Sequence, residues 1–161
     1  MFEQIVRMSR KGRLFMYGIA AIALIAALLP FAFVPEAKLP YPALAVAAVI
    51  GLCALIALVR PFTVLRVRVD AETLTIRLGW MRKRVELGRI VSCQSATYDW
   101  RHWGGWGIRT KPGATLYNVI GDEGVAVQLN LSNGSRLLFS STEPEAVCAA
   151  LRRQRPEIVR K

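Results

Sequence analysis

The sequence contains few of the residues from which enzyme sites are most often built. It has one histidine and three cysteines, and the cysteines lie far apart without a CxxC pair: Cys53, Cys93 and Cys148. A single histidine argues against a metal cluster, and the chain has no phosphate-binding glycine loop and no GxSxG motif. Three widely separated cysteines favour free thiols over a disulfide framework, which fits a reducing compartment. We therefore expect no metal, no cofactor and no enzymatic reaction.

One nucleophile set is the alternative that the sequence offers. Cys93, His102 and Asp99 are the right residue types for a nucleophile, a base and an orienting carboxylate, and an enzyme acting on a lipid would be the most plausible class. Cys93, however, lies in a strand-like run without a sign of thiolate activation. The pattern therefore favours a non-enzymatic protein.

Acidic residues are also scarce, because 11 Asp and Glu stand against 22 Lys and Arg, for a net charge of +11. Such an excess favours nucleic acid, anionic lipid or acidic protein partners. The basic residues are scattered, and many of them flank apolar runs, where membrane topology explains them. We expect no nucleic acid, and we expect a lipid bilayer as partner, with anionic headgroups or another membrane protein as further candidates.

Charge is absent altogether from two long runs, residues 14–34 and residues 41–59. Each run is long enough to cross a hydrocarbon core of about 30 Å at about 1.5 Å per residue. Both are apolar all round, unlike the single apolar stripe of a surface helix. The connector, residues 35–40, is short and has no net charge. The sequence predicts a transmembrane hairpin of two antiparallel helices over residues 14–59.

Cations flank this hairpin on both sides. They are Arg7, Arg10, Lys11 and Arg13 before it, and Arg60, Arg66 and Arg68 after it. Cytoplasmic flanks are enriched in Lys and Arg, so we expect a multi-pass protein of the cell's inner membrane with both termini in the cytoplasm and residues 1–13 as a basic cytoplasmic segment. The alternative is a cleaved signal peptide, but the first run is too long for one and the second run would remain.

The remainder of the chain changes to alternating apolar and polar residues, which is typical of half-buried strands. About seven short antiparallel strands are predicted, over residues 64–69, 73–78, 83–87, 90–97, 115–120, 125–131 and 136–139. A helix follows, with Thr142 and Glu145 as a capping box and Pro156 as its stop. Residues 61–155 are therefore an α+β, mainly β, domain, and residues 156–161 form a basic tail.

Particular segments resemble a known family. Two N-terminal apolar runs precede "VDAETLTIRLG", "WGGWGIR" and "GVAVQLNLSNGSRLLFSSTEPEAVCAAL". Over roughly residues 10–154 the chain resembles small bacterial membrane proteins with a cytoplasmic pleckstrin-homology-like domain. The resemblance implies a membrane-tethered, non-enzymatic interaction or scaffold module. Lipid-binding pleckstrin-homology domains of the eukaryotic kind hold an inositol phosphate in a basic loop between their first two strands. The corresponding residues 69–73 are acidic here, so phosphoinositide binding through this loop is not expected.

The stretch WRHWGGWGIR, residues 100–109, admits three interpretations. It can be structural, with glycines permitting a tight turn and Trp106 and Ile108 filling the core. It can rest on the bilayer, where tryptophan and cations favour the headgroup zone, which would make the domain an anionic-lipid sensor. It can be a protein or ligand site. The predicted lipid or partner contacts are Trp100, Arg101, Trp103, Trp106, Arg109 and Lys111.

The predicted orientation can be tested by fusing topology reporters to the C-terminus. The charge distribution predicts that a reporter active only in the cytoplasm is active and that one active only outside is silent. The reverse pattern would refute the placement.

Overall fold

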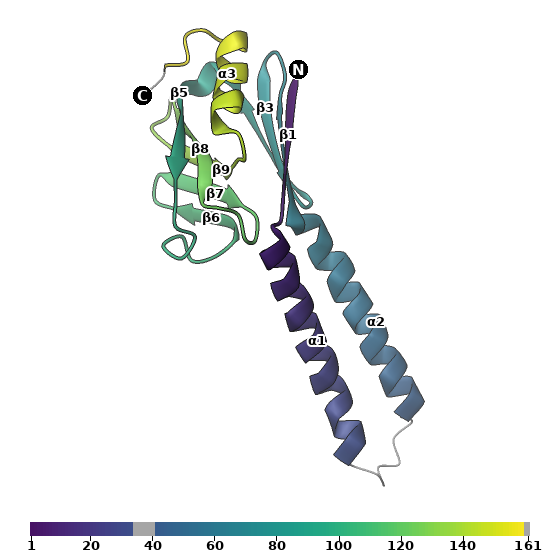
Figure 1. Ribbon diagram of the computed structural model, residues 1–161. Coiled ribbons are helices and arrows are strands. Elements are labelled where there is room, and N and C mark those ends of the chain that lie inside the picture. The colour runs from purple at the N-terminus through teal and green to yellow at the C-terminus, as the bar shows by residue number, and fades with distance from the viewer. Residues whose placement is uncertain (34–40, 160–161) are drawn as a thin grey trace. The chain divides into compact units, whose positions relative to one another are not determined.

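The computed structural model describes residues 1–33 and 41–159 and divides the chain into two compact units. One unit combines Met1–Ser9 with Pro61–Lys161, and the other is Arg10–Arg60. The fold is mixed α+β, as the sequence predicts, with two sheets of mostly antiparallel strands and a C-terminal helix (Figure 1). The predicted connector and the last two residues of the predicted basic tail lie outside the described residues.

Two neighbouring helices, α1 (Arg10–Phe33) and α2 (Tyr41–Val59), make up the second unit. α2 is followed directly by a 3-10 turn, η1 (Arg60–Thr63). In the part of the chain that the structure describes, one helical stretch is by length and composition able to cross a membrane. This stretch, Val46–Thr63, has a mean hydropathy of 2.1, and none of it is buried within the protein.

The first sheet has the order β1-β2-β3-β4, and every neighbouring pair is antiparallel. Its strands are β1 (Phe2–Arg7), β2 (Val64–Val69), β3 (Thr73–Leu78) and β4 (Met81–Glu86). β2 and β3 have the predicted bounds. Their alternation places Leu65, Val67 and Val69 inside, while arginines point outward.

β1 differs from the predicted organisation, in which residues 1–13 are a basic segment separate from the β domain. Phe2–Arg7 instead pair with β2 along its whole length, from Phe2 opposite Val69 to Arg7 opposite Val64. Only Gln4 and Val6 of this strand are buried, so the apolar alternation is too weak to recognise. The hydrogen-bonding partner, β2, follows only after the helical unit, and no local pattern indicates a pairing at that separation.

The second sheet has the order β5-β8-β9-β7-β6. Its strands are β5 (Ile90–Thr97), β6 (Gly107–Lys111), β7 (Ala114–Asn118), β8 (Val125–Leu131) and β9 (Arg136–Ser140), and a 3-10 turn, η2 (Leu87–Arg89), leads into β5. β6 was not predicted, because its glycine and two cations carry little β propensity. β7 and β9 run parallel, and the other pairs are antiparallel.

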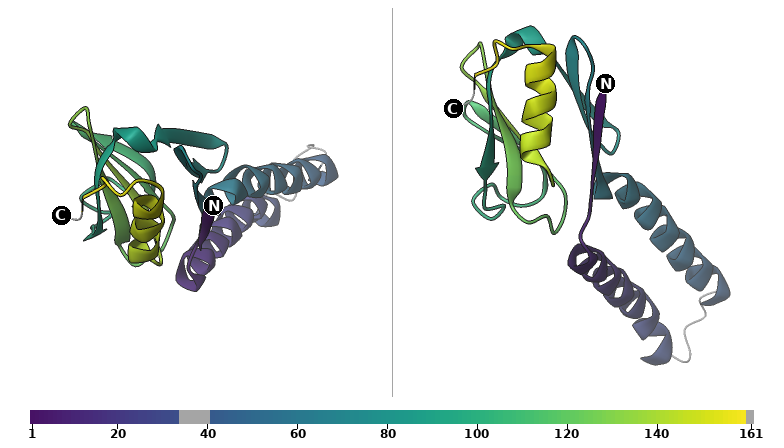
Figure 2. Two further views of the ribbon diagram at one scale, coloured as in Figure 1. Left: turned by 90° about the horizontal axis from the view of Figure 1, so that it is seen from above. Right: turned by 45° about the horizontal axis from the view of Figure 1, so that its top comes forward.

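The core of this β unit is shared by both sheets and by the helix α3 (Pro144–Gln154). α3 packs on β5 and β8 and also contacts β1 and β2 (Figure 2). Its buried side chains include Val147 and Leu151, which have no exposed surface. Apolar burial of this kind is the main stabilising term in folding, at about 25 cal/mol per Å². The predicted covering helix is confirmed.

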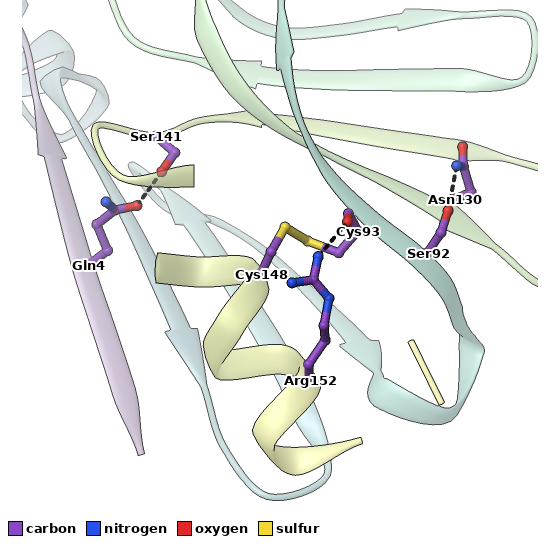
Figure 3. Close-up of a disulfide and its surroundings, with 7 residues drawn as sticks. All are labelled: Gln4, Ser92, Cys93, Asn130, Ser141, Cys148 and Arg152. Carbon is purple, nitrogen blue, oxygen red and sulfur yellow. Dashed lines mark hydrogen bonds between the residues drawn. A yellow bond between two sulfur atoms is a disulfide. The ribbon is translucent and has the colours of Figure 1, made fainter. Parts of the chain in front are cut away.

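A disulfide between Cys93 of β5 and Cys148 of α3 corrects the prediction of free thiols (Figure 3). Their Cα atoms are 5.6 Å apart, although 55 residues separate them in sequence. Both cysteines are buried, and Arg152 donates from Nη2 to the Cys93 carbonyl at 3.1 Å. The spacing of the cysteines does not reveal which helix face meets which strand, so this pairing could not be predicted from it. Cys53 is free and exposed.

The start of α3 also differs from the predicted capping box. Glu143, not Thr142, is the N-cap residue, and it makes no side-chain capping bond. The Thr142 hydroxyl instead accepts from Gln4 Nε2 at 3.1 Å. Ser141 Oγ donates to Gln4 Oε1 at 2.7 Å (Figure 3). The side chain of the unpredicted strand β1 has therefore taken the hydroxyl that the capping box needs.

The disulfide is expected to stabilise the β unit, because closing a loop of this length removes freedom from the unfolded chain. The chain-entropy model gives about 4 kcal/mol for such a loop. Replacing both Cys93 and Cys148 by alanine should therefore lower the unfolding free energy by roughly 2–4 kcal/mol. Urea unfolding of the full chain in detergent measures this loss. Cys53→Ala is the matched control and should leave the midpoint unchanged, and equal midpoints for both variants would contradict the role.

Candidate functional site

The tryptophan-rich stretch connects β5 to β6 as a compact series of turns. The amides of Trp103 and Gly105 both donate to the carbonyl of Trp100, at 3.2 and 2.9 Å. Gly105 has a φ of 116°, a conformation that residues with a side chain rarely adopt. The expectation that glycine permits a tight turn here is confirmed, and the loop has a defined backbone from which side chains project.

The predicted contact residues are brought together, but largely as partners of one another. Trp100 stacks on Trp106 with ring centroids 4.1 Å apart and an interplanar angle of 22°. The Arg101 guanidinium lies 5.0 Å from the Trp100 ring, and the Lys111 ammonium lies 5.1 Å from the Trp103 ring. These are cation–π distances. The cluster is therefore a pre-organised aromatic and cationic surface.

Some side chains of this stretch are packed, as the structural interpretation expects, and others are exposed, as a contact surface requires. All three tryptophans are half-buried, whereas Arg101, Arg109 and Lys111 are exposed. Ile108 packs against the core, as the structural interpretation expects, while Trp106 stacks on its neighbour Trp100. The aromatic groups thus serve a packing role, and the three cations form the outer rim.

A polar cluster holds the base of this loop. Asp122 accepts hydrogen bonds through Oδ2 from both the Tyr98 hydroxyl and Ser140 Oγ. The Tyr98 and Ser140 hydroxyls lie 3.0 Å apart. Tyr98 N also donates to the carbonyl of Gly124 at 2.8 Å, and a Cβ at Gly124 would come within 2.6 Å of the Tyr98 carbonyl oxygen. Three segments distant in sequence are thereby fixed at one point.

Burial raises the pKa of Tyr98 well above the ordinary tyrosine value, and the hydrogen bond to Asp122 raises it further. The phenol is therefore a neutral donor at physiological pH, which matches its position beside a carboxylate. This cluster was not predicted, because its residues share no motif and come from three separate segments: Tyr98 follows β5, Asp122 lies between β7 and β8, and Ser140 ends β9.

The alternative nucleophile set does not form. Cys93 is bonded to Cys148 and has no thiol to activate. His102 is highly exposed, and its Nδ1 lies 3.4 Å from Asp99 Oδ2 on the surface of the loop. Among the residues that the structure describes, no group of three or more His, Cys, Asp or Glu side chains is placed to hold a metal ion.

A second charged surface, which sequence reasoning missed, lies on the outer face of the first sheet. Arg66 of β2 is directly opposite Arg77 of β3, and Arg77 is directly opposite Arg82 of β4. We call these three residues, all of them exposed, the arginine ladder. Two residues along the strands, on the same face of the sheet, Arg68 and Arg84 flank Thr75 in the same way. The alternation within each strand predicts outward arginines, but only the register between strands places them side by side.

An exposed aromatic turn lies next to the arginine ladder. Trp80, between β3 and β4, is 59% exposed and meets Phe62 of η1 edge to face, with ring centroids 5.4 Å apart. Gly79 in this turn has a φ of 61°, and a Cβ there would come within 2.9 Å of the Phe62 ring. Glycine is therefore required both for the turn and for the close packing that presents Trp80.

Comparison with models of known protein families gives no match for this chain, and a search of curated proteins finds no similar sequence. Function is therefore inferred from the geometry of the β unit and of its connections to α1 and α2.

Tyr98 predicts a dependence of stability on alkaline pH. Its folded-state pKa is raised, so above about pH 10, the ordinary tyrosine pKa, the unfolded chain loses this proton while the folded chain keeps it. The unfolding free energy should therefore fall as pH rises through that range. Tyr98→Phe should cost about 1 kcal/mol at pH 7 through the lost hydrogen bond and should make the alkaline decline shallower.

Urea unfolding between pH 8 and pH 11 measures this effect. Tyr117→Phe is the matched comparison, because burial alone raises the pKa of Tyr117. An alkaline decline identical in wild type and Tyr98→Phe would show that the cluster does not hold the phenol neutral.

Proposed function

We propose that this protein is a membrane-anchored, non-enzymatic interaction module. In this account α1 and α2 form a transmembrane hairpin at the inner membrane, and the β unit is a pleckstrin-homology-like domain at the cytoplasmic face. The two packed sheets and the helix α3 across them support the resemblance in architecture. The proposal depends most on the way in which the helical unit is connected to the β unit.

The pairing of β1 with β2 is the observation that carries this proposal. β1 ends at Arg7, just before α1, and β2 begins at Val64, just after α2 and η1. Arg7 lies directly opposite Val64, and Met8 N donates to the carbonyl of Thr63 at 2.9 Å. Both connections to the helical unit therefore leave from the same end of one sheet. A chain that leaves and re-enters a folded unit on one side of a membrane must cross an even number of times.

That constraint supports a hairpin. If α2 crosses the bilayer, the chain between β1 and β2 needs a second crossing. α1 has 24 residues, about 36 Å at about 1.5 Å per residue, which exceeds a hydrocarbon core of about 30 Å. Large apolar side chains on both helices are exposed, including Ile22 at 68% and Ile50 at 62%. Exposed apolar surface of this extent is suited to lipid.

Two observations bear on the side of the membrane that the β unit occupies. The cationic flanks of the two helices favour the cytoplasm, whereas disulfides persist mainly in oxidising compartments. Cys93 and Cys148 are 0% and 2% exposed, and reduction requires a thiolate to reach one of the sulfur atoms. Burial therefore protects the disulfide from reduction even in a reducing compartment. The proposed cytoplasmic location of the β unit accordingly follows the charge distribution.

The interaction surface in this proposal is the tryptophan-rich stretch. Aromatic residues and arginine are enriched at binding hot spots, and ordering them in advance lowers the entropy cost of association. The stacked rings and the exposed cations of this loop meet both conditions. A second membrane protein is the partner class that the tethered position favours.

Crosslinking in cells tests this surface. A photoreactive amino acid at position 103 should give a discrete protein adduct, because Trp103 lies within the proposed contact. The matched control is position 133, where Asn133 occupies an exposed turn between β8 and β9 of the same unit. The adduct should be absent from position 133 and should weaken at least fivefold when Arg101 and Arg109 are changed to glutamine.

Equal labelling from both positions would refute the interaction surface. Anchoring is tested in the same membranes by extraction with alkaline carbonate. The account expects the full chain to stay in the membrane pellet, and its release into the aqueous fraction would refute the hairpin.

A further inference from the structure

We propose that the arginine ladder, together with the Trp80 turn, binds the phosphate groups of anionic lipids in the bilayer that holds the protein. This inference rests on the proposed membrane anchoring and adds a binding surface on the first sheet. The surface is distinct from the tryptophan-rich stretch, which belongs to the β5–β6 connection.

The charges of the ladder are uncompensated within the part of the chain that the structure describes. Arg66, Arg77 and Arg82 form no ion pair there, and Arg77 Nε donates only to the carbonyl of Gly79, at 3.2 Å. Arg68, two residues along the strand, is by contrast paired with Asp70 at 2.9 Å. Like charges directly opposite each other on neighbouring strands are destabilising. A bound anion would relieve this repulsion.

Guanidinium groups suit phosphate in particular. Each presents a planar set of donors that matches two phosphate oxygens at once. Three of them in a row across adjacent strands, at about 5 Å per step, offer several donor pairs to neighbouring headgroups. Because Arg66, Arg77 and Arg82 share one register level across three strands, the row suits several neighbouring headgroups at one depth better than one enclosed ligand.

The position of the ladder points to the membrane. Trp80 touches Phe62, and Phe62 belongs to the apolar stretch Val46–Thr63 that is able to cross a bilayer. Trp80 is thus held against the end of the proposed second crossing, where tryptophan favours the headgroup level. Met81 follows it and is 54% exposed, which extends the apolar tip.

The ladder lies at the right distance from this tip. Arg82 is two residues beyond Trp80, about 7 Å along the strand at about 3.3 Å per residue. This distance is within a Debye length of about 8 Å at physiological salt, so the charge is felt at the headgroups. Arg84 lies two residues further, beyond that length, and is expected to contribute less.

The tryptophan-rich stretch is less suited to this role. Its tryptophans are half-buried, and two of its cations already lie over aromatic rings of the same stretch. Trp80, by comparison, is more than half exposed. The exposed apolar and cationic groups that a lipid surface needs therefore occur together at the β3–β4 turn.

Lipid counting on the full chain tests the inference. The protein in neutral detergent is mixed with equal amounts of phosphatidylglycerol and phosphatidylcholine, and native mass spectrometry counts each bound lipid. The full chain is required, because β1 precedes α1 and belongs to the β unit. Wild type should prefer phosphatidylglycerol, and the variant R66Q/R77Q/R82Q should lose this preference. The ratio of bound phosphatidylglycerol to bound phosphatidylcholine should fall about fivefold for each arginine removed.

The matched control is R101Q/R109Q/K111Q, which removes the same charge from the tryptophan-rich stretch and from Lys111 at the end of β6. It should keep the preference for phosphatidylglycerol. Retention of the preference by the ladder variant would overturn the inference, and so would an equal loss in both variants, which would indicate net charge alone. Tighter binding of a short single-stranded DNA than of phosphatidylglycerol, abolished in the ladder variant, would also overturn it and assign the surface to nucleic acid.

The urea midpoint of the ladder variant is a second measurement, because a structural role and a lipid-binding role of the arginines predict opposite changes in it. Removing three mutually repelling charges should leave the urea midpoint of the ladder variant unchanged or raised. A lower midpoint would mean that the arginines support the fold, and would overturn the inference. Carbonate extraction of the same variant separates the two proposals, because anchoring by the hairpin should persist whether or not the ladder binds lipid.

Discussion

The hydrogen-bonded pairing of β1 with β2 is the constraint on which the organisation of this protein depends. It joins the first residues of the chain to residues that follow the helical unit, so that the chain leaves the first sheet after β1 and returns to it in β2 at the same end of the sheet. Gln4 extends this constraint beyond the sheet, because its side chain bonds Ser141 and Thr142 just before α3. The N-terminal strand thus ties the first sheet to the start of the C-terminal helix.

The functional consequences follow from the end of the sheet at which these connections meet. Paired at Leu65 and Leu78, β2 and β3 bring the turn that carries Trp80 to the same end as Phe62. The arginine ladder begins one register position further along. The order from apolar tip to cationic row matches the order from acyl chain to phosphate in a lipid monolayer. The Tyr98–Asp122–Ser140 cluster holds the base of the tryptophan-rich stretch separately from the first sheet, and that stretch is the proposed contact for a protein partner.

Much of the fold could be predicted from local pattern. β2, β3 and β8 have the predicted bounds, because their apolar residues alternate and glycine, asparagine or acidic residues lie at their ends. β5 also has the predicted bounds, although its apolar residues do not alternate regularly. α3 was recognised from its apolar stripe and its proline boundaries. β1 and β6 were missed, because each buries too few apolar side chains to show the period. The capping box failed for a related reason, since Gln4 of β1 engages the threonine that it required.

Features that depend on contacts distant in sequence could not be predicted. Neither cysteine spacing nor strand periodicity indicates that Cys93 and Cys148 meet, because the pairing depends on how α3 lies across β5. The six predicted contact residues do come together, four in the β5–β6 connection and two, Arg109 and Lys111, in β6, but their mutual stacking was not expected. The arginine ladder required the register of three strands, which one sequence does not supply.

The central claim is that both ends of the chain lie on the same side of the membrane because β1 pairs with β2. The most direct measurement is protease digestion of sealed vesicles of known orientation that carry the full chain with different tags at its two ends. The account predicts that both tags are cleaved in one vesicle orientation and that both are protected in the other. Cleavage of one tag with protection of the other in the same vesicles would contradict it.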